Sequence, residues 1–115
     1  MPPASSAYDR NMSRRIDKSW LVYVSVETQE HDRCVDFFAR PDGTYGFETF
    51  RRDPEDGGAW TPLSYHSAAA FPSAADAVRA AEAAVPWLAD RFARDPALRA
   101  LTSSYVLPGI DPPQD

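Results

Sequence analysis

A chain of 115 residues has the size of one domain and can bury a core without metal or disulfide cross-links. Hydrophobic residues make up 43% of the chain and aromatic residues 12%, which excludes a wholly disordered protein. The net charge of −5 disfavours binding to nucleic-acid phosphates, and basic residues gather only near Arg10, Arg14, Arg15 and Lys18.

The two ends of the chain are rich in proline, at Pro2, Pro3, Pro108, Pro112 and Pro113. We expect flexible tails over residues 1–16 and 108–115 and one folded domain over residues 17–107. Cys34 is the only cysteine, so no disulfide can form within the chain, which fits a reducing compartment. No long apolar run follows Met1, so we expect a cytoplasmic protein without membrane association. The abundance of Ala, Arg, Asp and Pro suggests a GC-rich bacterial genome.

Residues 20–27 are rich in β-branched and aromatic side chains and predict the first strand. Regular alternation would place Trp20, Val22, Val24 and Val26 together on the core face. Residues 34–40 predict the second strand, with alternate side chains again divided between two faces.

The pair Asp42-Gly43 between two apolar runs predicts a tight hairpin turn. The third strand should follow over residues 45–52 and carry aromatic side chains on both faces. The acidic, Gly- and Pro-containing residues 53–58 predict a loop. Residues 60–67 predict a fourth strand, which Pro62 would confine to an edge of the sheet.

Ser73 and Asp76 predict the start of an amphipathic helix in the manner of a capping box. Its apolar stripe consists of Ala77, Val78, Ala81, Val85, Leu88 and Phe92. Pro86 should kink or restart this helix, because proline lacks the N–H that a continuous helix needs. Asp95-Pro96 predicts a second start, followed by a short terminal helix that buries Leu98 and Leu101.

Together these elements predict an α+β fold. Three or four antiparallel strands in meander order should precede a long helix on one face and a short C-terminal helix. Since both faces of the meander carry apolar side chains, one face needs a second cover. The segment after Pro86 or a second copy of the chain could supply it.

The aromatic hairpin suggests an interaction surface, because Tyr, Trp, Phe and Arg are the residue types enriched at interface centres. The candidate residues are Tyr45, Phe47, Phe50, Arg51, Arg52 and Trp60. The function we favour is a small, non-catalytic interaction or regulatory domain that forms a homodimer or binds a protein partner. An alternative is a nucleic-acid-binding module that stacks bases on the same aromatic and arginine residues, although the acidic balance disfavours it.

A third possibility is a small-ligand binder or enzyme with a pocket near Cys34, Trp60 and His66. One cysteine and two histidines do not supply a typical zinc site, and no phosphate-binding loop, nucleophile elbow or cofactor motif is present. Asp36 and Glu48 could form a carboxylate pair, but cross-strand pairing with arginines is the simpler interpretation. We therefore assign no catalytic, cofactor-binding or metal-binding residue from the sequence. The fragment Val85-Pro86-Trp87-Leu88 is distinctive but points to no activity.

Overall fold

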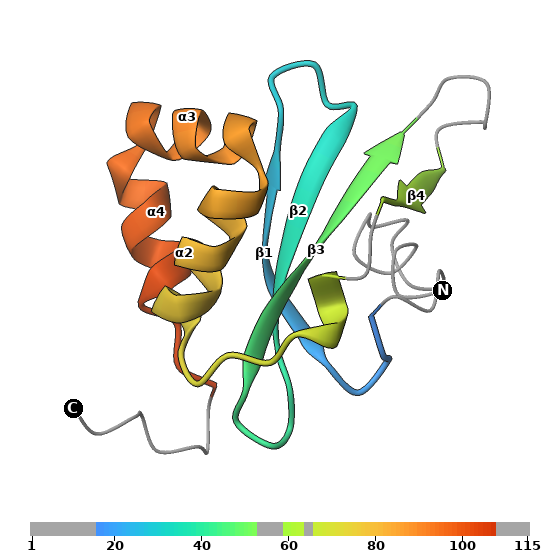
Figure 1. The fold of residues 1–115 in the computed structure, drawn as a ribbon, viewed down its shortest axis with the longest axis vertical. Helices are drawn as coiled ribbons and strands as arrows, with labels where there is room; N and C mark the ends of the chain where they lie inside the picture. Colours follow the sequence, from blue (N-terminus) through green and yellow to red (C-terminus); the bar gives the residue numbers. More distant parts are fainter. Residues whose placement is uncertain (1–15, 53–58, 64–65, 108–115) are drawn as a thin grey trace.

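The computed structural model describes residues 16–52, 59–63 and 66–107. The predictions for the two tails beyond these bounds and for the loop at 53–58 lie outside the described residues. Four antiparallel strands form one sheet in the order β1-β2-β3-β4, and three α-helices follow in sequence (Figure 1). The predicted α+β meander is therefore confirmed.

The strands are β1 (Leu21–Glu27), β2 (Arg33–Ala39), β3 (Tyr45–Arg52) and β4 (Trp60–Pro62). The predicted hairpin turn joins β2 to β3. The Gly43 N–H donates to the Arg40 carbonyl at 3.0 Å, and Gly43 takes φ 89°, a conformation that glycine adopts without strain. The fourth strand ends at Pro62, earlier than predicted, and a 3-10 turn, η2 (His66–Ala68), follows it.

The prediction that Trp20, Val22, Val24 and Val26 share one face is wrong. The register of β1 on β2 shifts between Val22 and Val24, so that Val22 lies opposite Phe38 and Val24 lies opposite Phe37. This β-bulge adds one residue to β1, so that the side chains after it alternate in the opposite sense and point to the opposite faces of the sheet. Trp20 and Val22 consequently pack on one face of the sheet, and Val24 and Val26 pack on the other.

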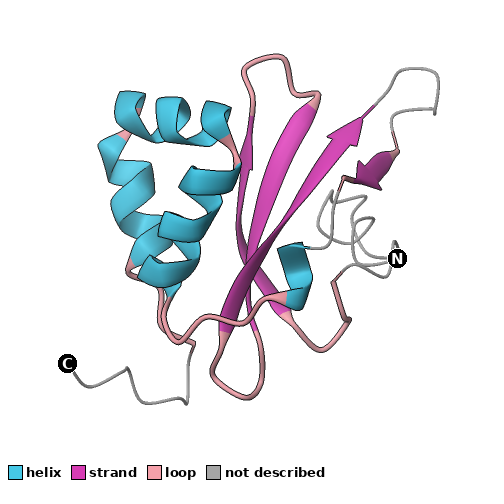
Figure 2. Cartoon of the chain, in the orientation of Figure 1, coloured by secondary structure: helices cyan, strands magenta, loops and turns pink. Residues whose placement is uncertain are grey.

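The helices are α2 (Ala74–Ala84), α3 (Pro86–Arg94) and α4 (Pro96–Ser103), and all three lie on one side of the sheet (Figure 2). The Ser73 side chain caps α2 by accepting from the Asp76 N–H, as predicted. The helix ends at Val85 and restarts at Pro86, and Asp95 caps α4 through the Leu98 N–H. Leu101 was predicted to be buried but is 63% exposed, and Thr102 is the buried residue of α4 instead.

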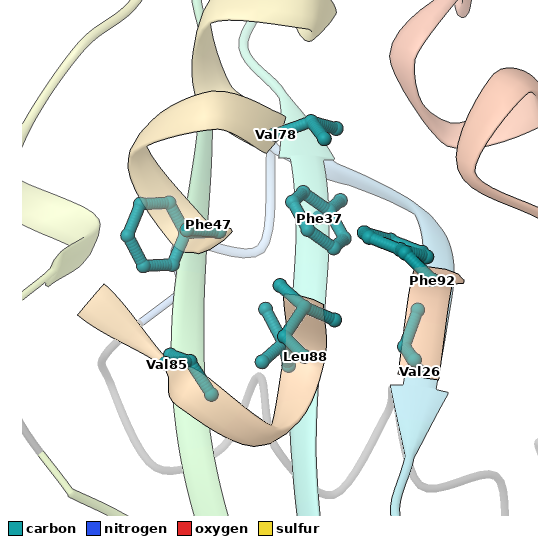
Figure 3. Close-up of a cluster of buried hydrophobic side chains, with 9 residues drawn as sticks. Val26, Phe37, Phe47, Val78, Val85, Leu88 and Phe92 are labelled. Atoms are coloured by element: carbon teal, nitrogen blue, oxygen red, sulfur yellow. The ribbon is translucent and has the colours of Figure 1, made fainter. Parts of the chain in front are cut away.

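The side of the sheet under the helices is called the helix face. Its core is formed by Val26, Val35, Phe37 and Phe47 from the strands with Val78, Ala81, Val85, Leu88 and Phe92 from the helices (Figure 3). The whole predicted apolar stripe of the helices is buried. Since α3 and α4 join α2 on this face, the segment after Pro86 does not cover the opposite side of the sheet.

The opposite side, called the second face, has its own buried cluster of Ile16, Cys34, Phe38, Phe50 and Trp60. Trp20 stacks on Phe38 with ring centroids 4.9 Å apart. The Phe38 ring also lies across Gly46, where a Cβ would come within 2.7 Å of it. This close approach requires a glycine at position 46.

Candidate functional site

The structure distributes the six residues of the predicted aromatic surface over both faces of the sheet. Tyr45 and Phe47 lie on the helix face, and Phe50 and Trp60 lie on the second face. All four aromatic side chains are at most 8% exposed. Their rings therefore pack inside the domain, where they cannot stack on the bases of a nucleic acid without local unfolding.

The two arginines of this predicted surface are more accessible than its aromatic rings. Arg51 is exposed, whereas Arg52 is half-buried. The guanidinium of Arg52 lies 4.8 Å from the centre of the Trp60 ring and donates to the His31 carbonyl at 2.7 Å. Arg52 thus holds the β1–β2 turn against the end of β3, so its role in the described structure is to stabilise this part of the fold.

The predicted pocket near Cys34, Trp60 and His66 is brought together only in part. Cys34 and His66 line the same hollow, and Trp60 does not. The Cys34 thiol is fully buried and lies 3.9 Å from Oδ1 of Asp36, within the longer range of a sulfur hydrogen bond. The His66 ring stacks on Phe47 with centroids 4.9 Å apart. Both side chains are packed into the structure from opposite faces of the sheet.

A first hollow, the turn hollow, separates the β1–β2 turn from α3 and has a volume of about 600 Å³. Its main lining residues are Glu27, Glu30, His31, Trp87, Asp90 and Arg91. His31 closes the turn in the left-handed region at φ 61°, and its Nδ1 lies 3.1 Å from Oε1 of Glu27. The turn wall of this hollow is therefore acidic and anchored to the end of β1.

A second hollow, the strand-end hollow, lies where α2 gives way to α3 and has a volume of about 290 Å³. Its main lining residues are Arg33, Thr49, Leu63, His66, Val85 and Trp87. None of the described residues that line it carries a carboxylate. Arg33 also lies directly opposite Arg51 in the β2–β3 register, which adds a second positive charge near this end of the sheet.

Among the residues that the structure describes, Trp87 alone lines both hollows. Pro86 explains its place, because the chain turns at the break between α2 and α3 and Trp87 is the second residue of the new helix. The indole is half-buried and packs against the core of the helix face. The fragment that contains Trp87 is distinctive in the sequence, but it did not predict this site. The two hollows are formed by segments that come together only in the folded chain.

The charged groups of the turn hollow are mostly paired. Arg94 lies 3.2 Å from Asp90 of the same helix, and Arg91 lies 3.5 Å from Asp95, the residue that follows α3. In the described part of the chain, Glu30 is exposed and has no ion-pair partner. The turn wall therefore carries a negative charge at Glu30 that no described ion pair balances, whereas the arginines of α3 pair with Asp90 and Asp95.

The second face buries charged side chains that neither hollow reaches. Asp36 and Glu48 lie opposite each other in the β2–β3 register, and both are fully buried. The Glu48 carboxylate accepts from the Ser67 and Thr49 N–H groups at 3.0 Å each. Arg40 donates to the Ser67 carbonyl at 2.6 Å, and burial lowers its pKa. These bonds hold the η2 turn against the sheet.

The described residues contain no group of three or more His, Cys, Asp or Glu side chains able to hold a metal ion. In the same part of the chain, none of the helices has the length and apolar character needed to cross a membrane. Comparison of the chain with protein-family models, with curated proteins and with solved structures finds no match. The protein is thus defined by its fold and surface: an α+β domain with a four-stranded meander and two hollows around Trp87.

Proposed function

We propose that this protein is a non-catalytic interaction domain that docks a protein partner on the surface around Trp87. The observation that carries the proposal is the half-buried indole shared by two hollows. Tryptophan is the residue type most enriched among interface hot spots, and such residues lie at the centre of a contact surface. This surface replaces the aromatic hairpin as the docking site, because the hairpin rings are buried in the domain itself.

Selection of displayed random peptides on the immobilised protein tests this proposal without a known partner. We expect peptides that bind the wild-type protein and lose at least about tenfold in affinity with Trp87→Ala, a typical hot-spot effect. The matched control is Leu101→Ala, which truncates the most exposed large hydrophobic side chain on α4, outside both hollows. Peptides that bind all three proteins equally, or a selection that enriches none, would contradict the proposal.

A location in a bacterial cytoplasm is also part of this proposal. Cys34 is the only cysteine of the chain and its thiol is buried, which suits a reducing compartment. Fractionation of cells that make the protein, followed by detection of the chain, checks the location. Recovery in a secreted or membrane fraction would contradict it.

A small-ligand site in the strand-end hollow is the second candidate, since Cys34 and His66 both line it. A ligand there would slow the reaction of Cys34 with a thiol reagent. The buried thiol already predicts slow labelling of the native protein. Fast labelling that a bound small molecule suppresses would favour this candidate over the interaction domain.

A further inference from the structure

The two sides of the Trp87 surface differ in charge. On one side, the turn hollow has carboxylates at Glu27, Glu30 and Asp90, and its two α3 arginines pair with Asp90 and with Asp95, the residue that follows α3. On the other side, the described residues that line the strand-end hollow include Arg33 and no carboxylate. Trp87 lies between the two sides as the shared aromatic centre.

In a symmetric dimer whose two-fold axis passes through the centre of a patch and divides its two sides, each side meets the opposite side of the copy. A patch with an aromatic centre, an acidic side and a basic side is therefore complementary to itself. Resting on the proposed function of this surface, we propose that its occupant is a second copy of the chain. In the dimer, the two Trp87 side chains meet near the symmetry axis, and Glu30 of each copy faces Arg33 of the other.

The exposure of the contributing side chains supports this arrangement. Arg33 is 42% exposed and lies 3.8 Å from the carboxylate of Asp32, so its guanidinium is accessible to a stronger partner. Leu63 lines the strand-end hollow and is 47% exposed, which adds apolar area beside the indole. The other exposed large hydrophobic residues in the described part of the chain are Leu21, Leu101 and Val106, and they line neither hollow. Apolar area available for a dimer contact thus coincides with the charged surface.

The first measurement is the solution mass of the full chain by sedimentation equilibrium at low salt, from micromolar to millimolar concentration. We expect a monomer–dimer equilibrium that weakens as salt screens the charges. Trp87→Ala should raise the dissociation constant at least about tenfold, and the control Leu101→Ala should leave it unchanged. A wild-type protein that stays monomeric throughout, or a dimer that Trp87→Ala leaves intact, would overturn the inference.

A charge exchange tests the pairing even if Trp87→Ala fails to fold. Glu30→Arg and Arg33→Glu should each raise the dissociation constant by roughly threefold to tenfold, because each places like charges across the interface. An equimolar mixture of these two variants should recover the wild-type affinity, since both contacts of the mixed dimer then join opposite charges. Circular dichroism verifies that each variant is folded.

A mixture of the two charge variants that associates no better than either variant alone would overturn the inference. Failure of the dimer can be distinguished from failure of the proposed docking function by the peptide selection. If selected peptides still depend on Trp87 while the chain stays monomeric, the docking surface stands and its occupant is a different protein. If neither peptides nor a second copy depend on Trp87, both proposals fail.

Discussion

On the helix face of the sheet the core cluster consists of apolar side chains, whereas the second face buries the charged side chains of Asp36, Arg40 and Glu48 among its aromatic rings. The helix face is stabilised by burial of apolar surface, which needs complementary shape but no particular partner atoms. On the second face each charged group needs its own hydrogen-bond partner, because an unpaired buried charge is strongly destabilising. The two faces of one sheet should therefore respond differently to substitution.

The largest expected effect is on the helix face. Phe37→Ala removes a fully buried ring that lies 6.3 Å from Phe47 and 6.4 Å from Phe92, measured between ring centroids. We expect the free energy of unfolding to fall by about 3–5 kcal/mol, from lost burial and the cavity left behind. Urea denaturation followed by circular dichroism measures this change. Phe37→Leu is the control and should cost less than about 1.5 kcal/mol, because most of the volume is kept.

On the second face, Glu48→Ala should cost about 3 kcal/mol, because it leaves the buried Ser67 and Thr49 N–H groups without their acceptor. Glu48→Gln keeps an oxygen acceptor and should cost only about 1 kcal/mol. Denaturation and hydrogen exchange of the Ser67 amide measure the two effects. An increase in stability with Glu48→Gln would instead show that repulsion from Asp36 outweighs the hydrogen bonds to this carboxylate.

The same contrast explains what the sequence could predict. Apolar periodicity alone located the buried stripe from Ala77 to Phe92 on the helix face, and local rules located Ser73 and Pro86 at the helix ends. The bulge in β1 depends on how this strand pairs with β2, and the alternation of apolar residues in the β1 sequence does not reveal it. It therefore reversed the predicted face for Trp20 and Val22.

The site is harder to predict from sequence than the fold. Two hollows meet at Trp87 only because the β1–β2 turn, the end of β3 and the α2–α3 break converge in space. These segments are far apart in the chain, and no local pattern links them. Conversely, the aromatic hairpin resembled a surface because the sequence does not show that Ile16 and Trp20 pack over its second face.

A polar contact on the helix face offers a smaller test. Tyr45 Oη accepts from the Leu107 N–H at 3.0 Å and so ties the end of α4 and its following segment to the sheet. Tyr45→Phe should cost about 1 kcal/mol and speed hydrogen exchange of the Leu107 amide. The control is Tyr23→Phe, which removes a different bond, from Tyr23 Oη to the Thr102 carbonyl at 3.1 Å. Equal exchange of the Leu107 amide in both variants would contradict this assignment.

The smallest effect should come from the ion pair at the surface of the helix layer. Arg99 binds Glu82 through two hydrogen bonds of 2.8 and 2.9 Å, which joins α4 to α2. These bonds lower the pKa of Glu82 below its usual value of 4.5. The contribution to stability is thus fully present above that value and disappears as the pH falls through the lower folded-state pKa. Removing the pair should therefore matter at neutral pH and not in acid.

Arg99→Gln should cost about 0.5–1 kcal/mol at pH 7, as expected for a two-point but partly exposed pair. Denaturation of this variant and the wild type across the acid range should show the difference shrinking below about pH 4.5. Arg94→Gln is the control, because its pair with Asp90 is mostly exposed and should contribute close to nothing. A difference for Arg99→Gln that stays constant with pH would assign the effect to packing of the arginine stem rather than to its charge.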